Sequence, residues 1–517
     1  MSGRRYIAIV ALLAMLGLAL AAFFYSGPFY EYDDMDYIVF AHQMLNGTFS
    51  MHTPRAYGLL MPLVLALSFK AFGYGTFQAE LPSIVEYIAM ALLAFLLGRK
   101  LFGSTEGLLA MLFVIIAPFI VQYATRAMPD MLIGMLTGMS LYALASAGYS
   151  SRRIQGRRNA LFLLSGAFAA LTIYAKLEGL AFVLFFALSL LVLSMYHVKA
   201  KGKRQPSALS ISLSEFMYAM LGVAVAICLY MAISYAYTGS AIIALENYGA
   251  WQHAISPVGL SDNLANLYVT LFGYLYTGSG SILAAYQISP IIYPYGFSIV
   301  FSIIGTIFAI GDRKRNAAFL SLLSWPIFFY LFFGTMELSS YTFIAVITRY
   351  FSIIAIPLAV LAAYGLVGFH MKLESRIGRK AYAISAIFIA EIVLFSVPTF
   401  LMIHEYNSAI GSDTRVLTLA ANVMRYHSLP VFSNNYEAAE YASIMSGSDY
   451  GVAPISACSG ASSAYLLYFY NSSASANPGA INAPPQCNIS LIENIGPKVA
   501  GSAYGVPVMG CAIYKAD

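Results

Sequence analysis

A short stretch near the amino end of the chain concentrates acidic side chains. Four carboxylates, those of Glu31, Asp33, Asp34 and Asp36, occur within six consecutive positions. Only 10% of the 517 residues are charged, so this density is not needed to keep a loop soluble. Carboxylates gathered in this way accept protons from reacting groups or bind a cation. The stretch therefore predicts a functional site.

Further ionisable residues stand at the ends of apolar segments. They are Arg126, Asp130, Lys176, Glu178 and Arg349. A charged group in or near hydrocarbon costs free energy, so such residues are generally paired or functional. In the topology that the basic residues indicate, all five fall on the same membrane face as the acidic stretch. We therefore expect them to contribute to one site.

The elements that carry these residues are far too apolar for a soluble domain. Hydrophobic residues make up 60% of the chain, and the mean hydropathy is +0.73. A helix needs roughly 20 apolar residues to cross a bilayer. We predict an α-helical polytopic membrane protein with about eleven spans, at residues 6–25, 81–97, 107–123, 131–147, 161–174, 181–196, 216–237, 291–310, 317–333, 343–366 and 381–401.

Basic residues indicate how these spans are oriented. Of the 28 Lys and Arg residues, 19 occur in short clusters between apolar segments, as the positive-inside rule predicts for cytoplasmic loops. The amino terminus is then cytoplasmic, and the acidic stretch and the carboxyl end are extracytoplasmic. Residues 57–73 would invert every later cluster if they spanned, so we predict a re-entrant or surface-lying segment. Because the basic residues serve topology, we expect membrane lipids and no nucleic acid as partners.

The residues that follow the acidic stretch are spaced for a helix on the membrane surface. Tyr37, Ile38, Ala41, Met44 and Leu45 recur with the period of one helix face. Such a helix would hold the acidic side chains at the boundary between water and lipid.

The composition changes after residue 401. Asn, Ser, Gly and Ala become frequent, residues 430–432 and 508–514 read as strands, and residues 416–425 and 437–445 read as helices. We predict two domains: a membrane domain over residues 1–408 and a small extracytoplasmic α/β domain over residues 409–517.

Five motifs resemble, in order and in spacing, those of the GT-C glycosyltransferases related to protein O-mannosyltransferases and lipid A aminoarabinose transferases. The first is Asp33-Asp34 with Tyr37, which is similar to an Asp-Glu-x-x-Tyr loop. The second is His52-Thr53-Pro54 with Tyr57, which is similar to His-Pro-Pro-Leu-Tyr, and the third is Arg126 to Asp130, which is similar to Arg-x-x-Pro-Asp. The fourth is Lys176 with Gly179, which is similar to Lys-x-x-Gly. The fifth is Arg349-Tyr350 with Pro357, which is similar to an Arg-Tyr pair seven residues before a Pro. The resemblance covers about residues 6–365.

The chain departs from the family pattern in a few places. Asp34 stands where the family has Glu, and Thr53 replaces the first Pro of the second motif. The Trp-Trp-Asp motif of oligosaccharyltransferases is absent, since the only two Trp residues, Trp251 and Trp325, are not adjacent. The first two differences concern the acceptor side of the expected site.

The resemblance implies transfer of a sugar, a hexose or a pentose, from a polyprenyl-phosphate or dolichyl-phosphate donor to a protein, glycan or lipid acceptor, with inversion. Asp33 would be the general base, and Asp34 and Asp130 would be further catalytic carboxylates. Cations that stabilise the leaving phosphate would be Lys176, Arg349 and Arg126. Substrate-binding residues would be Tyr37, His52, Tyr57 and Tyr350.

Each role has an alternative. Asp33, Asp34 and Asp130 stand where a carboxylate caps a helix, and Lys176 and Arg349 are placed to reach lipid headgroups. No residue is assigned to a metal site; a divalent cation between Asp34, Asp130 and a histidine is the open cofactor possibility. For the whole chain the alternatives are a secondary transporter, which predicts internal repeats, and a receptor that binds a partner through its external domain.

Overall fold

The structure is a computed structural model. It describes residues 3–25, 32–50, 58–149, 155–199, 211–243, 246, 298–311, 315–333, 348–394, 396–397 and 400, and five strands between residues 431 and 516. Statements below concern these residues.

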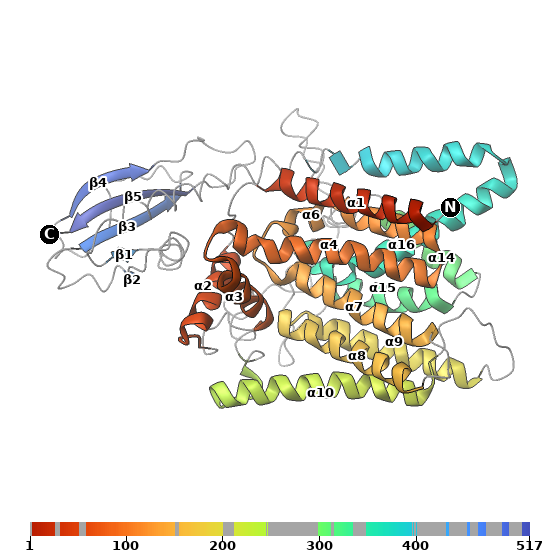
Figure 1. The fold of residues 1–517 in the computed structure, drawn as a ribbon, viewed down its shortest axis with the longest axis horizontal. Coiled ribbons are helices and arrows are strands. Elements are labelled where there is room, and N and C mark those ends of the chain that lie inside the picture. Colours follow the sequence, from red (N-terminus) through yellow and green to blue (C-terminus); the bar gives the residue numbers. More distant parts are fainter. Residues whose placement is uncertain are drawn as a thin grey trace.

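Helices dominate the part of the chain before residue 400. The first eight are α1 (Gly3–Phe24), α2 (Tyr32–Asn46), α3 (Leu60–Phe72), α4 (Thr76–Leu101), α5 (Ser104–Ile115), α6 (Pro118–Ala124), α7 (Pro129–Tyr149) and α8 (Gln155–Ala175). They are followed by α9 (Gly179–Lys199), α10 (Leu213–Thr238), α14 (Ser298–Gly311), α15 (Arg315–Phe333), the short 3-10 helix η3 (Thr348–Phe351) and α16 (Ser352–Ile377). A further helix covers residues 380–394. The long helices lie side by side in a bundle (Figure 1).

The chain is a multi-pass membrane protein by the length and composition of these helices. In the described residues, α1, α4, α7, α8, α10 and α16 are long and apolar enough to cross a membrane, and the bent pair α5 and α6 makes up to seven spans. Each of the eleven expected spans overlaps a helix. However, α9, α14 and α15 are shorter apolar helices, so the described residues do not reach eleven spans of full length.

The segment expected to be one span at residues 107–123 is broken. Its two helices, α5 and α6, meet at a bend of 62°. Pro118 opens α6 and has no backbone N–H for the preceding turn, while Ala117 before it is extended. The bend matters for the site because α6 leads directly to Arg126.

The acidic stretch lies in α2, and the apolar face of this helix packs inside the protein and not on the membrane surface. Ile38 and Ala41 are buried, and α2 packs on α3. His42 of α2 also contacts the segment between α3 and α4, because its Nδ1 lies 2.9 Å from the hydroxyl of Tyr74. The apolar face of α2 was expected to lie on lipid. Most of it packs against other parts of the protein instead, which buries its apolar side chains, and of this face Leu45 is exposed.

Small residues allow two helices of the bundle to approach closely. A Cβ atom on Gly166 of α8 would overlap the backbone carbonyl of Ala219 on α10, and one on Gly222 would overlap that of Leu163. Helices in membranes pack by such close backbone contact because burying apolar surface gives little gain in lipid.

The strands near the carboxyl end form one sheet. They are β1 (Val431–Ser433), β2 (Val452–Pro454), β3 (Ala464–Asn471), β4 (Ile489–Ile495) and β5 (Met509–Ala516), in the order β2-β1-β3-β5-β4. β1 pairs in parallel with β2 and β3, whereas β5 is antiparallel to β3 and β4. The strands expected at 430–432 and 508–514 are thus β1 and β5; the expected helices lie outside the described residues. The sheet lies beyond the end of the bundle that carries α2 and α3 (Figure 1).

Candidate active site

Lys176 occupies the tight turn between α8 and α9. The backbone N–H of Gly179 donates to the Lys176 carbonyl, which closes the turn. The Lys176 ammonium lies 3.4 Å from Asp130 Oδ1, 3.7 Å from Glu178 Oε1 and 4.2 Å from the centroid of the Tyr350 ring. All four residues are buried. The alternative that Lys176 extends to lipid headgroups is therefore wrong, because its ammonium is held inside the protein.

Asp130 is placed by the start of α7. Pro129 opens this helix, and Asp130 lies in its first turn, where backbone N–H groups and the helix dipole favour a carboxylate. Its side chain is buried and contacts Lys176, which is 46 residues away in the sequence. The helix start and the ammonium therefore both fix the place of this carboxylate.

A second group of buried charges lies around Arg126, just before α7. Arg126 is 1% exposed, and its guanidinium carbon lies 4.7 Å from the centroid of the Tyr123 ring. Glu80, in the first turns of α4, interacts electrostatically with Arg126 and with Asp34 of α2. Asp34 is fully buried and Glu80 is 3% exposed. These three side chains come from α2, α4 and the segment before α7.

The two groups of charges adjoin each other. Arg126 and Asp130 are four residues apart, and the Met128 N–H donates to the Arg126 carbonyl, which tightens the segment between them. Gly58 brings a further segment to the same place: a Cβ atom there would overlap the carbonyl oxygen of Ala175, next to Lys176. The amino end of α3 thus touches the turn that carries the lysine.

Most of the residues predicted for the site can be located. The structure brings Asp130, Lys176 and Tyr350 into contact and buries Asp34, Arg126 and Tyr37. Asp33 is in the first turn of α2 and Arg349 is in η3, but their side chains lie outside the described set. His52 and Tyr57 fall outside the described residues.

Sequence reasoning missed Glu80. It stands one residue before the expected span at 81–97, at the same kind of helix start that drew attention to Asp130. The signal was therefore present, as an ionisable residue at the outer end of an apolar segment. Glu86, which is buried within that span, was missed as well.

Among the described residues, buried acidic side chains outnumber buried basic ones at the site. Four buried carboxylates, those of Asp34, Glu80, Asp130 and Glu178, face two buried cations, Arg126 and Lys176. Within the described part of the chain, no three His, Cys, Asp or Glu side chains are grouped as metal ligands.

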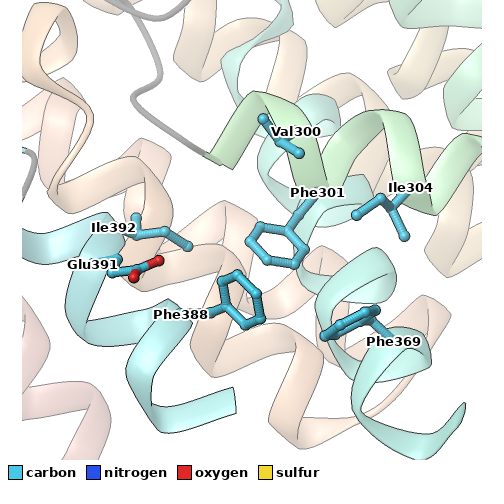
Figure 2. Close-up of a pocket in the computed structure, with 7 residues that line it drawn as sticks. All are labelled: Val300, Phe301, Ile304, Phe369, Phe388, Glu391 and Ile392. Atoms are coloured by element: carbon cyan, nitrogen blue, oxygen red, sulfur yellow. The ribbon is translucent and has the colours of Figure 1, made fainter. Parts of the chain in front are cut away.

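An apolar cavity lies elsewhere in the bundle. It has a volume of about 210 Å³ between α14, α16 and the helix over residues 380–394. Figure 2 shows the lining side chains, which are Val300, Phe301, Ile304, Phe369, Phe388, Glu391 and Ile392. Glu391 is the one ionisable residue among them, so this cavity offers little to polar chemistry. The charged groups around Lys176 and Arg126 remain the candidate site.

Part of the chain is similar to a known family. Residues 54–217, about a third of the chain, match the family model described as dolichyl-phosphate-mannose-protein mannosyltransferase. The match includes α3 to α9, and hence Glu80, Arg126, Asp130 and Lys176. No curated protein sequence matches the chain.

Solved structures share the fold of this chain. The ArnT structure from Cupriavidus metallidurans bound to undecaprenyl phosphate is 12% identical, with a TM-score of 0.58, and the match covers 99% of this chain and 98% of ArnT. An Archaeoglobus fulgidus oligosaccharyltransferase tethered with an acceptor peptide is 13% identical, with a TM-score of 0.58 and 86% of this chain covered. This chain spans 64% of that enzyme's length. At these identities the likeness shows the fold alone.

Proposed function

We propose that this protein is a GT-C glycosyltransferase, which transfers a sugar from a polyprenyl-phosphate or dolichyl-phosphate donor to a hydroxyl-bearing or amide-bearing acceptor on a protein, glycan or lipid. The observation that carries the proposal is the buried contact of Lys176 with Asp130 and Tyr350 beside Arg126 and Asp34. The match of residues 54–217 to the mannosyltransferase family model supports the same chemistry, as do the lipid phosphate and the acceptor peptide named in the solved structures of the same fold. The site would face the extracytoplasmic side, with the amino terminus in the cytoplasm.

The reaction needs a base for a hydroxyl acceptor. In the proposed mechanism, Asp33 takes the proton of the acceptor hydroxyl while the hydroxyl oxygen bonds to the anomeric carbon. The bond between that carbon and the phosphate oxygen breaks, and its electron pair leaves with the lipid phosphate. One displacement of this kind inverts the anomeric centre. Asp34, the next residue, is buried beside Glu80 and would orient the acceptor.

The leaving phosphate needs fixed positive charge. Lys176 supplies it from a turn closed by backbone hydrogen bonds, and the Tyr350 ring lies against the ammonium and limits its motion. Asp130 and Glu178 lie 3.4 and 3.7 Å from the ammonium and hold it in place. Arg349, next to Tyr350 in η3, and Arg126 would add planar groups suited to phosphate oxygens.

Turnover of lipid-linked sugars tests this proposal. The purified protein would be given a panel of polyprenyl-phosphate sugars with a membrane extract as acceptor, and lipid phosphate release and sugar transfer would be followed. We expect turnover of at least one donor, and a loss of about 10²–10³ in turnover for Lys176→Met. Lys70→Met, at an exposed position on α3, is the matched control and retains turnover. Release of lipid phosphate from none of the donors would refute the proposal.

A further inference from the structure

The apolar cavity between α14, α16 and the helix over residues 380–394 has no role in the proposed mechanism. The rings of Phe301, Phe369 and Phe388 meet at this cavity, with centroids 5.6 to 6.4 Å apart (Figure 2). The cavity opens to the outside of the bundle, because Val300 in its lining is 42% exposed. Its volume is about 210 Å³, and apolar cavities of this size stay dry and accept hydrocarbon. In a membrane protein, an opening of this kind faces lipid.

Two cations follow the cavity along α16. Phe369, Lys372 and Arg376 are spaced three and four residues apart, so they share one face of this helix. The Lys372 ammonium lies 3.9 Å from the centroid of the Phe308 ring on α14. Ile304, one turn before Phe308, lines the cavity. Lys372 therefore lies between α14 and α16, about one helical turn from the cavity.

More positive charge stands at the turn where α16 ends. Gly378 ends the helix with a φ of 60°, and Arg379 and Lys380 follow directly. Glu374 is the one acidic residue between positions 370 and 385 in the sequence, and its carboxylate lies 3.8 Å from His370 Nε2. The four cations of this region are all exposed: Lys372, Arg376, Arg379 and Lys380. Four cations against one carboxylate make this end of the hairpin a site for an anionic group.

The spacing of the cations and the cavity fits one lipid molecule. Phe369 and Arg376 are seven residues apart, which is about 10 Å along a helix. The hydrocarbon of one leaflet is about 15 Å thick, half of the bilayer core. A lipid whose phosphate meets Arg376 therefore has its chain at the depth of the cavity. Glu391, the ionisable residue of the lining, stands one turn beyond Phe388 and so on the side away from the cations.

We infer that this surface binds an anionic phospholipid, with the phosphate at Lys372 and Arg376 and one acyl chain in the cavity. The site is far from the proposed active site. Tyr350 lies just before α16, which begins at Ser352, and Arg376 is near the other end of this helix, about 36 Å along its axis. That distance exceeds the roughly 30 Å of the bilayer core. The lipid therefore belongs to the opposite leaflet from the active site, and the inference does not depend on sugar transfer.

Lipid-dependent thermal unfolding tests the phosphate contact. The full-length protein in detergent would be titrated with dioleoyl phosphatidylglycerol, which is anionic, or dioleoyl phosphatidylcholine, which is zwitterionic. We expect phosphatidylglycerol to raise the Tm at the lower lipid concentration, because a ligand of the folded state stabilises it. With Lys372→Gln and Arg376→Gln combined, the half-maximal rise should need about 10- to 30-fold more phosphatidylglycerol. Both positions are exposed, so this variant should fold.

An exposed cation elsewhere provides the control for charge. Arg157 stands at the start of α8, whose other end leads to Lys176, so it lies at the same end of the bundle as the basic turn. Arg157→Gln should respond to phosphatidylglycerol like the wild type. Equal responses of Arg157→Gln and the double variant would overturn the inference, because the cations would then act only as general surface charge. Equal stabilisation by the two lipids would overturn it as well.

A second pair of variants tests the cavity. Ile304→Trp fills it, whereas Ile307→Trp adds the same bulk to α14 at a position that is 59% exposed. We expect Ile304→Trp to need several-fold more phosphatidylglycerol for the half-maximal rise, and Ile307→Trp to match the wild type. Glycerol 3-phosphate, which carries the phosphate without chains, should not raise the Tm over the same concentrations. A wild-type response of Ile304→Trp, or a full response to glycerol 3-phosphate, would show that no chain occupies the cavity and would overturn the inference.

Discussion

The contact between Lys176 and Asp130 predicts a large effect of removing the lysine on stability. Lys176→Met keeps the side-chain length but leaves Asp130 and Glu178, which are 1% and 2% exposed, without the ammonium at 3.4 and 3.7 Å. Breaking a buried ion pair by removing one partner costs about 3–5 kcal/mol, because the remaining charge stays buried. We therefore expect a clearly lower Tm than for Lys70→Met, which should change stability by about 0.5 kcal/mol or less.

A second substitution makes this prediction sharper. Asp130→Asn added to Lys176→Met removes one of the stranded carboxylates, so the double variant should be more stable than Lys176→Met alone. Turnover should stay low, because the cation needed at the leaving phosphate is still missing. Thermal unfolding in one detergent, with sugar transfer measured on the same samples, checks both results. A Lys176→Met protein that unfolds like Lys70→Met would refute the buried ion pair and the reasoning built on it.

Three further predictions concern other parts of the bundle. Arg158 of α8 lies 2.6 Å from Glu215 of α10, and both side chains are buried. Arg158→Met should therefore lower the Tm by far more than Arg157→Met at the exposed neighbouring position. Equal Tm values of the two variants would contradict this. Gly58→Ala should reduce turnover about tenfold, because the added Cβ would displace the turn that carries Lys176. Gly156→Ala should leave turnover unchanged, because a Cβ at that position meets open space. The sugar-transfer assay on both variants tests this prediction. Gly166→Leu should separate α8 from α10 and lower the Tm well below that of Gly156→Leu, and a wild-type Tm for Gly166→Leu would show that the close contact is not required.

Much of the fold could be predicted because apolar segments have a physical length. Each expected span overlaps at least one helix, since a chain in lipid must satisfy its backbone hydrogen bonds within the segment, although only six or seven of the described spans are long enough to cross a membrane. The break at Pro118 was not predicted, because an apolar run with one proline fits both a kinked span and two helices. The packing of α2 inside the protein was missed as well, because an apolar face reads the same whether it contacts lipid or protein.

The site could be predicted only in part. Ionisable residues next to apolar segments pointed to Arg126, Asp130 and Lys176, and the cost of burying charge explains why this signal worked. Which of them pair depends on how helices far apart in the sequence are packed, so the contact between Asp130 and Lys176 could not be read from spacing. Glu80 was missed although it carries the same signal, because it stands at the edge of a segment that was assessed only as a span.

The charge imbalance of the site also emerged only from the structure. From the sequence, the acidic stretch and the phosphate-binding cations were expected at one face of the membrane. The structure buries Glu80 and Glu178 among them, so carboxylates outnumber cations in the described part of the site. Under the proposed function, a lipid phosphate arriving there would compete with these carboxylates for Lys176 and Arg126.

One comparison tests the proposed chemistry most directly: sugar transfer by the wild type, Asp33→Asn and Asp36→Asn, with donor binding measured on the same preparations. Asp33 and Asp36 both lie in α2, and Asp36 is the partly exposed acid of the stretch, so it controls for the loss of one negative charge. Loss of a general base typically lowers the rate 10²–10⁴-fold. We predict such a loss for Asp33→Asn with donor binding retained, and near wild-type transfer for Asp36→Asn. Equal transfer by the two variants would contradict the assignment of Asp33 as the base.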